Sequence, residues 1–238
     1  MRRCHIYLPN EYFTNPTKKF PVLYLQHGMG ENEYGWAEQG HTAQILDNLI
    51  AEGKAVPCII VMDNGLNTRR PGEAGGFGGF GGQRPQGAPG QGGPRRGGFG
   101  GFSEGFKNVL FNDIIPMVET HYRVIADPQH RAYAGLSMGG MQAREITLAN
   151  PEKFAYVGSF SSGAWNVDQV KGSEGFAKNV KLLFMSGGGK ENMGVVEAAK
   201  NIKEQLGMNA VGYDSPGTAH EWHTWRRSLY QFAQLIFK

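Results

Sequence analysis

A serine with a glycine two residues to either side is the strongest chemical signal in this sequence of 238 residues. The segment Gly135-Leu136-Ser137-Met138-Gly139 matches the pattern G-x-S-x-G, which holds a reactive serine on a sharp strand-to-helix turn. The flanking glycines leave room for neighbouring backbone at such a turn. The helix that follows directs free N–H groups and a positive dipole at a developing oxyanion. Ser137 is therefore the predicted nucleophile of an acyl-transfer reaction.

A serine hydroxyl needs a base that takes its proton, and histidine serves most often. Two histidines, His220 and His223, lie well after Ser137, in the chain order typical of hydrolases with this motif. His220 follows a flexible loop over residues 215–218, which would let its ring reach the serine, so we favour it as the base. His223 is the alternative, although it is also interpreted as a surface or groove-lining residue at the start of the last helix.

The third residue of such a site is a carboxylate that orients the imidazole and stabilises its charged form. The loop after the predicted strand 181–185 contains one acid, Glu191, next to Lys190. Glu191 is the predicted acid, and a solvated pair with Lys190 is the other interpretation. Asp214 is a second candidate because it lies near His220 in the sequence, but it is expected to lie within a strand.

The oxyanion of a tetrahedral intermediate needs N–H donors. One is expected from Met138, the residue after the nucleophile, and one from the loop after the first strand, which reads His27-Gly28-Met29-Gly30. We expect the Met29 amide to be the second donor and Gly28 to allow its close approach. His27 itself is expected to be a hydrogen-bonded structural residue.

Strands alternate with helices along the chain, which predicts an α/β fold with a mostly parallel sheet and helices on both faces. Sites in such folds lie on the loops after the strands, where the residues above are found. Predicted strands cover 22–26, 58–62, 131–134, 154–160, 181–185 and 210–213, and predicted helices cover 41–52, 104–120, 138–149, 193–206 and 224–237.

Glycine is unusually abundant, with 36 residues, of which 15 lie between Gly72 and Gly101. The low-complexity stretch 72–102 contains GGFGGFGG and GGFGGF and fits no regular element. It interrupts one domain, because elements on both sides are needed to complete the sheet, so we expect a single domain over 1–238. The insertion is interpreted either as a cover over the site that meets an aromatic substrate or as a surface segment.

Charge and composition exclude several classes of protein. The net charge is +3, and residues 69–101 carry five arginines against one glutamate, which leaves the rest close to neutral and argues against nucleic-acid binding. The segment 95–99, RRGGF, resembles RGG segments of nucleic-acid-binding proteins, but five arginines are too few to favour that function. No apolar run approaches the roughly 18 residues that span a membrane. The two cysteines lack metal-site spacing, and no signal peptide is visible.

Several blocks of the sequence together resemble family-one carbohydrate esterases, a group with feruloyl and acetyl xylan esterases that is related to esterase D and the mycolyltransferases. The resemblance runs from about Ile6 to Phe237, except for 72–102. It implies an α/β-hydrolase fold and a Ser/acid/His triad on Ser137 and His220, with no metal or cofactor. The blocks are HGMGENEYGW (27–36), VMDNG (61–65), FNDIIPMVETHYRV (111–124), HRAYAGLSMGGM (130–141) and GTAHEWHTWRRSLYQF (217–232).

The sequence departs from that family at the acid. Many members carry Asp in a G-x-x-D loop after this strand, and Asn192 occupies the corresponding position here. Asparagine cannot carry the charge that stabilises an imidazolium. Because Glu is longer than Asp by one methylene, we expect Glu191 to serve from the adjacent position. A weakened triad and a non-catalytic carbohydrate-binding relative are the alternatives.

For the substrate, the resemblance implies hydroxycinnamoyl or acetyl esters of plant xylan, and we favour feruloyl esters. Trp36 and Trp222 would offer flat surfaces to sugars or to an aromatic acyl group, and Asn64 is expected to contact substrate. Packing of the last helix is the other interpretation of Trp222 and the favoured one for Trp225. Acyl transfer to an acceptor other than water is compatible with the same residues. The resemblance also implies a secreted or periplasmic protein.

Overall fold

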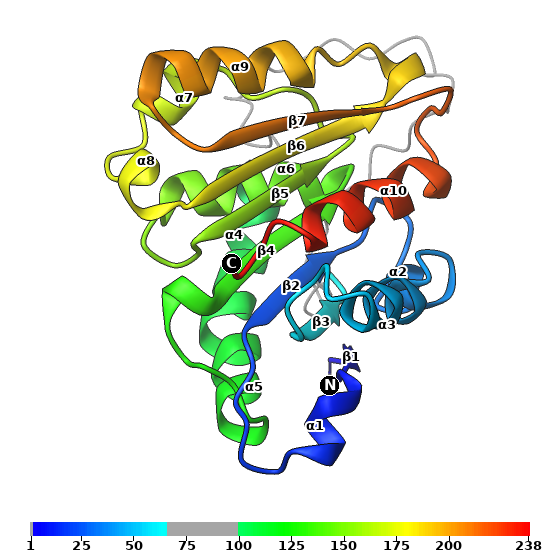
Figure 1. The fold of residues 1–238 in the computed structure, drawn as a ribbon. Coiled ribbons are helices and arrows are strands. Elements are labelled where there is room, and N and C mark those ends of the chain that lie inside the picture. The colour runs from blue at the N-terminus through cyan, green and yellow to red at the C-terminus, as the bar shows by residue number, and fades with distance from the viewer. Residues whose placement is uncertain (1, 66–99) are drawn as a thin grey trace, which may run out of the picture.

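The computed structural model describes residues 2–65 and 100–238, and a seven-stranded sheet lies at its centre (Figure 1). The strand order is β1-β3-β2-β4-β5-β6-β7. Among the strands that the structure describes, only β1 runs antiparallel, against β3, so the predicted mostly parallel sheet is confirmed. The strands are β1 (Cys4–Tyr7), β2 (Val22–Gln26), β3 (Ile59–Asp63), β4 (Arg131–Leu136), β5 (Tyr156–Phe160), β6 (Leu182–Gly188) and β7 (Ala210–Ser215).

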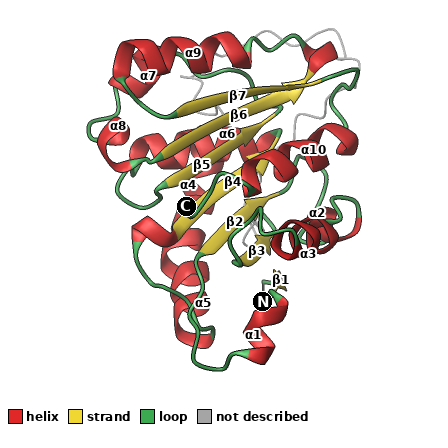
Figure 2. Ribbon diagram, in the orientation of Figure 1, coloured by secondary structure: helices red, strands yellow, loops and turns green. Residues whose placement is uncertain are grey.

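Helices cover both faces of the sheet (Figure 2). The short helices are α1 (Asn10–Thr14), α2 (Gly35–Glu38), α7 (Val167–Lys171) and α8 (Phe176–Asn179). The longer ones are α3 (Thr42–Ala51), α4 (Gly100–Val109), α5 (Ile115–His121), α6 (Met138–Ala149), α9 (Val195–Leu206) and α10 (Trp222–Ala233). A π-helical turn, Leu110–Ile114, joins α4 to α5, and short 3₁₀ turns cover Pro128–His130 and Gly189–Glu191.

Alternation along the central strands divides the core between the two faces of the sheet. Leu23 and Leu25 of β2 pack in one cluster with residues of α3 and α10. Val22 and Tyr24 of the same strand pack on the other side with residues of α5 and α6. Successive side chains of a strand point to opposite faces, so a strand buried on both faces must be apolar almost throughout. This explains why β2 reads as a continuous apolar run.

The structure differs from the predicted elements mainly at their ends. The predicted strand 181–185 continues as β6 to Gly188, and 210–213 continues as β7 to Ser215, because Gly187 and Gly188 pair in register with the end of β7. Glycine has a low strand propensity, which predicts that the strand ends before these residues, but pairing with β7 overrides that propensity. The edge strand β1 and the short helices were not predicted. Residues 72–99 of the insertion lie outside the described residues, but residues 100–102, which were expected to fit no regular element, belong to α4. The single domain over 1–238 stays a prediction.

No helix within residues 2–65 and 100–238 is long and apolar enough to cross a membrane.

Candidate active site

Ser137 lies on a strained turn between β4 and α6. Its φ of 50° and ψ of −111° are rare for a residue with a side chain. The turn closes because glycines flank it: a Cβ on Gly135 would lie 2.4 Å from the backbone carbon of Gly139, and a Cβ on Gly139 would lie 2.6 Å from the carbonyl oxygen of His27. The structure therefore has the sharp strand-to-helix geometry that the G-x-S-x-G motif predicts.

The three residues predicted to form a triad lie in one hydrogen-bonded chain. Nε2 of His220 is 3.0 Å from Oγ of Ser137, and Nδ1 of His220 is 2.7 Å from Oε1 of Glu191. An ionised carboxylate only accepts hydrogen bonds, so Nδ1 carries the ring proton and Nε2 is left to accept the serine proton. Ser137 lies in the turn between β4 and α6. Glu191 is the last residue of the 3₁₀ turn after β6, and His220 lies between β7 and α10.

Glu191 is held as an anion. Its side chain is only 8% exposed, and burial alone would raise its pKa. Hydrogen bonds from Ser161, from the Gly188 amide and from His220 favour the charged form more strongly, so the pKa of Glu191 is lowered from its ordinary value. Because of this lowered pKa, the carboxylate is negatively charged whenever the His220 imidazole takes up a proton and needs a negative partner.

The other residues considered for the acid and the base are not part of this hydrogen-bonded chain. Asn192, next to Glu191, is exposed and adopts a left-handed conformation with φ 52°. Asp214 is an exposed residue of β7, and His223 is exposed in the first turn of α10. The hydrogen bonds to Ser137 and Glu191 belong to His220. Glutamate thus reaches the histidine from one position before the expected aspartate.

The backbone of Gly28 lies against the nucleophile. A Cβ on Gly28 would lie 2.5 Å from Cδ1 of Leu136 and 3.5 Å from Cβ of Ser137. The Gly28 amide donates to Oε2 of Glu31 at 3.0 Å, so it is already engaged. Met29 follows it, with a side chain 48% exposed. Met138 is the first residue of α6, where an amide has no acceptor within its helix.

His27 is a buried structural residue, as the sequence indicated. It is 1% exposed, its Nε2 accepts the Gly65 amide at 3.2 Å, and its Nδ1 lies 2.7 Å from the Gly28 carbonyl oxygen. Burial lowers its pKa. A neutral ring with an acceptor at Nε2 and a donor at Nδ1 matches both contacts, so His27 fixes the loop after β2 to the loop after β3.

The prediction that Trp36 offers a flat surface to substrate is wrong. Trp36 is 1% exposed, and its indole N–H donates to the carbonyl oxygen of Gln26 at 2.9 Å. The short helix α2 places the ring in the core, where it packs edge-on against Trp222 with centroids 5.3 Å apart. Trp222 is half-buried, so part of its surface stays open. Asn64 is also half-buried, directly after β3.

Two contacts of the site were not predicted. The Ser161 hydroxyl donates to Oε2 of Glu191 at 2.7 Å, and the ring of Trp225 packs edge-on against that of His220 at 5.1 Å. Trp225 is 7% exposed, in line with the expected packing of the last helix. The sequence carries no distinctive signal for Ser161, because a serine after a strand usually belongs to a turn.

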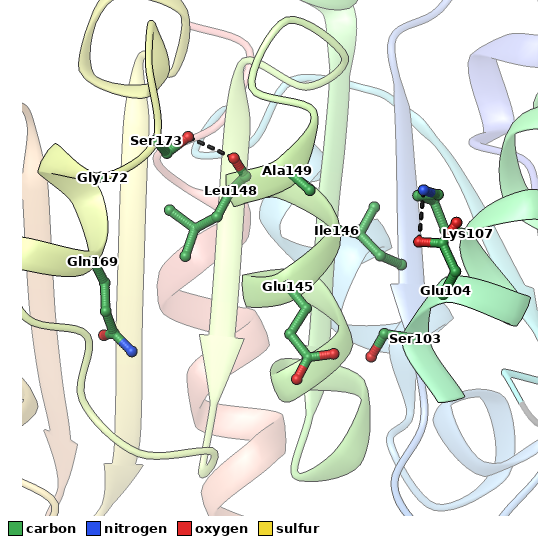
Figure 3. Close-up of a pocket in the computed structure, with 10 residues that line it drawn as sticks. All are labelled: Ser103, Glu104, Lys107, Glu145, Ile146, Leu148, Ala149, Gln169, Gly172 and Ser173. Carbon is green, nitrogen blue, oxygen red and sulfur yellow. Dashed lines mark hydrogen bonds and ion pairs between the residues drawn. The ribbon is translucent and has the colours of Figure 1, made fainter. Parts of the chain in front are cut away.

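A cavity of about 410 Å³ is lined by residues of α4, α6 and α7 and of the turn after α7 (Figure 3). Glu145 points into it, and none of the residues that line it belongs to the hydrogen-bonded chain above. The described residues contain no group of three or more His, Cys, Asp or Glu side chains arranged to hold a metal ion. The cavity is lined by Ser103, Glu104, Lys107, Glu145, Ile146, Leu148, Ala149, Gln169, Gly172 and Ser173.

A family of esterases matches nearly the whole chain. The model of the family Esterase, described as "Putative esterase", matches residues 1–235. The chain belongs to the Esterase family. The resemblance to carbohydrate esterases seen in the sequence is therefore confirmed at the level of this family.

Relatives of this Esterase chain include a protein with feruloyl esterase in its name. It is 38% identical over 242 residues to an "Endo-1,4-beta-xylanase/feruloyl esterase" of Xylanibacter ruminicola. That alignment covers 100% of the chain but 30% of the relative, so the chain spans less than a third of that protein.

Solved structures share the fold of the Esterase chain. A ferulic acid esterase superimposes with a TM-score of 0.71 at 26% identity, covering 98% of this chain and 91% of that one. A CE1 ferulic acid esterase from Anaeromyces mucronatus, in complex with ferulic acid, superimposes with a TM-score of 0.73 at 23% identity, covering 99% and 85%. The α/β-hydrolase fold predicted from the sequence is confirmed.

Proposed function

We propose that the chain is a serine carboxylic-ester hydrolase that releases hydroxycinnamates from feruloylated xylan. The observation that carries the reaction type is the unbroken hydrogen-bonded chain from Ser137 through His220 to Glu191. The choice of acyl group rests on similarity, namely 38% identity to a protein named xylanase/feruloyl esterase and the fold of a ferulic acid esterase at 26% identity.

In the first step, Oγ of Ser137 attacks the ester carbonyl carbon while Nε2 of His220 takes its proton. The Ser137 oxygen gains a bond to carbon, and the carbonyl π electrons move onto oxygen. The resulting oxyanion accepts hydrogen bonds from the amides of Met138 and Met29. Glu191 stabilises the imidazolium through its bond to Nδ1 at 2.7 Å.

The tetrahedral intermediate then breaks its bond to the sugar alkoxide. His220 gives its proton to that leaving oxygen, and an acyl-enzyme on Ser137 remains. In the second step, water gives a proton to His220 and attacks the acyl carbon. His220 returns the proton to Oγ as the hydroxycinnamate leaves. Each step uses one proton acceptor, so the same imidazole serves twice.

The open surface beside the nucleophile suits a planar, largely apolar acyl group. Met29 is 48% exposed and directly follows Gly28, where an added Cβ would lie 3.5 Å from Cβ of Ser137. Trp222 is half-buried and is held by edge-on contacts to Trp36 and to Trp225. Rigid aromatic rings bind flat ligands at low entropic cost, so we assign Trp222 to substrate contact. We assign Asn64 to substrate contact because it is half-buried directly after β3, at the edge of the sheet where sites of such folds lie.

Hydrolysis of methyl ferulate and release of acetate from acetylated xylan, measured side by side, test this proposal. We expect turnover of methyl ferulate by the wild type and its loss in Ser137→Ala. Ser162→Ala is the matched control, because its hydroxyl lies 2.5 Å from Oγ of Ser159 and takes no part in the proposed steps. Turnover by Ser137→Ala equal to that of the wild type would overturn the mechanism. Wild-type activity on acetylated xylan without activity on methyl ferulate would overturn the assignment of a hydroxycinnamoyl group.

A further inference from the structure

Ser161 is a buried residue with an unusual backbone conformation next to the acid. It directly follows β5, is 3% exposed and has a φ of 48°. Its amide donates to the carbonyl oxygen of Ser186 in β6 at 2.7 Å. The backbone of Ser161 is therefore bonded to β6, the strand that leads into the turn with Glu191.

The two oxygens of Glu191 have separate partners. Oε2 accepts the hydroxyl of Ser161 and the amide of Gly188, each at 2.7 Å. Oε1 faces Nδ1 of His220, also at 2.7 Å. Because Oε2 is held by two donors, one directly after β5 and one at the end of β6, the carboxylate plane is fixed and Oε1 is directed at the imidazole.

We propose that Ser161 is a positioning residue of the esterase, which orients the Glu191 carboxylate toward His220. This inference rests on the proposed function. A glutamate has one more side-chain torsion than the aspartate usual in related enzymes, and each free torsion lowers the fraction of molecules that are correctly aligned. A hydrogen bond to the second carboxylate oxygen removes that freedom.

The backbone conformation supports a role for the hydroxyl. A residue with a side chain in the left-handed region is strained, and glycine would avoid that strain. Serine here keeps the strain and gains the bond to Glu191. The two effects separate experimentally, because glycine at 161 relieves the strain while alanine retains it, and both lack the hydroxyl.

The first test compares Ser161→Ala and Ser161→Gly with the wild type on methyl ferulate, with Ser162→Ala as the matched control. We expect kcat to fall about ten- to a hundredfold in both variants at 161, as for loss of a hydrogen bond to a charged group, while KM stays unchanged. The control should stay within about twofold of wild type. Wild-type kcat in Ser161→Gly would show that only the backbone conformation matters and would overturn the proposal.

The second test needs no substrate. The proton between Nδ1 of His220 and Glu191 gives a low-field proton NMR signal, identified by its loss in Glu191→Gln. We expect this signal to shift or broaden in Ser161→Ala and in Ser161→Gly, but not in Ser162→Ala. An unchanged signal would overturn the role of Ser161. Absence of turnover by the wild type, with the signal altered as expected, would instead count against the proposed function alone.

Discussion

The amide of Lys190 donates to the carbonyl oxygen of Thr218 at 2.9 Å, which joins the loop of the acid directly to the loop of the histidine. Thr218 is in turn held by α10, because its hydroxyl oxygen accepts a hydrogen bond from the hydroxyl of Thr224 at 2.7 Å. Both threonines are buried. Glu191 and His220 therefore share one scaffold, and a displacement of either loop moves both.

The close approach of these loops predicts that Gly188→Ala impairs catalysis. A Cβ at 188 would lie 2.6 Å from the carbonyl oxygens of both Thr218 and Ala219, and backbone cannot yield cheaply. We expect His220 to move and kcat to fall about a hundredfold, as for a misplacement of about 1 Å. Steady-state kinetics on methyl ferulate measure this effect.

Gly187→Ala is the matched control for that change. Its Cβ would meet the sulfur of Met193 at 3.2 Å, which is the far end of a flexible side chain. We expect kcat to stay near the wild-type value. Equal losses in the two variants would show that strand β6 tolerates no side chain here, and the specific role of the loop contact would be wrong.

The position of the acid is tested by a pair of neighbouring substitutions. Glu191→Gln keeps the shape of the side chain but removes its charge, so the imidazolium loses its stabilising partner and kcat should fall about 10³–10⁴-fold. Asn192→Gly should leave kcat nearly unchanged, because Asn192 is exposed and its left-handed φ suits glycine. A larger loss of kcat in Asn192→Gly than in Glu191→Gln would show that Glu191 is not the acid of the triad.

The sequence was sufficient to predict the hydrogen-bonded chain because each of its members follows a predicted strand. Ser137 lies in a motif with a fixed backbone geometry, and Glu191 is the one acid in its loop. Ser161 was not predictable in the same way. Its contact with Glu191 depends on the register between β5 and β6, where Phe160 pairs with Ser186, and no local pattern encodes that register.

The misassignment of Trp36 has a similar cause. The residue type suggested a flat surface for substrate, but it does not encode the direction in which the ring points. The helix α2 turns the ring into the core, and the packing of Trp222 on top of it leaves it 1% exposed. Burial of this kind depends on residues nearly 190 positions apart, so it follows from the fold and not from the neighbouring sequence.

The two tryptophans should therefore respond differently to substitution. Trp36→Ala removes a buried ring and the hydrogen bond to Gln26, so it should lower the free energy of unfolding by about 3–5 kcal/mol. Trp222→Ala should instead raise KM for methyl ferulate, with a smaller loss of stability, because Trp222 is only half-buried. Urea denaturation and steady-state kinetics on both variants measure the contrast. A raised KM in Trp222→Ala that Trp222→Phe does not restore would show that the indole itself, rather than a flat ring, is needed.

A buried acid at the end of β3 predicts a pH dependence of stability. Asp63 is 4% exposed, and burial raises its pKa from 3.8 to about 6, although Arg2 at 3.0 Å and the thiol of Cys4 partly offset this effect. At pH values between 3.8 and about 6, Asp63 is protonated in the folded chain and ionised in the unfolded chain. The contribution of Asp63 to stability is therefore greatest below pH 3.8 and is lost as the pH rises to about 6.

Asp63→Asn removes this titration, so the difference in unfolding free energy between variant and wild type should change across pH 4 to 6 and level off above. Urea denaturation at a series of pH values measures that difference. Asp127→Asn is the matched control: burial raises the pKa of Asp127, but hydrogen bonds from His130 and Gln129 and the charge of His130 together bring it below its ordinary value of 3.8, so its contribution to stability is present above pH 3.8 and is lost as the pH falls further. The control difference should therefore be flat over pH 4.5 to 6. A flat difference for Asp63→Asn over the same range would mean that Arg2 keeps Asp63 ionised throughout.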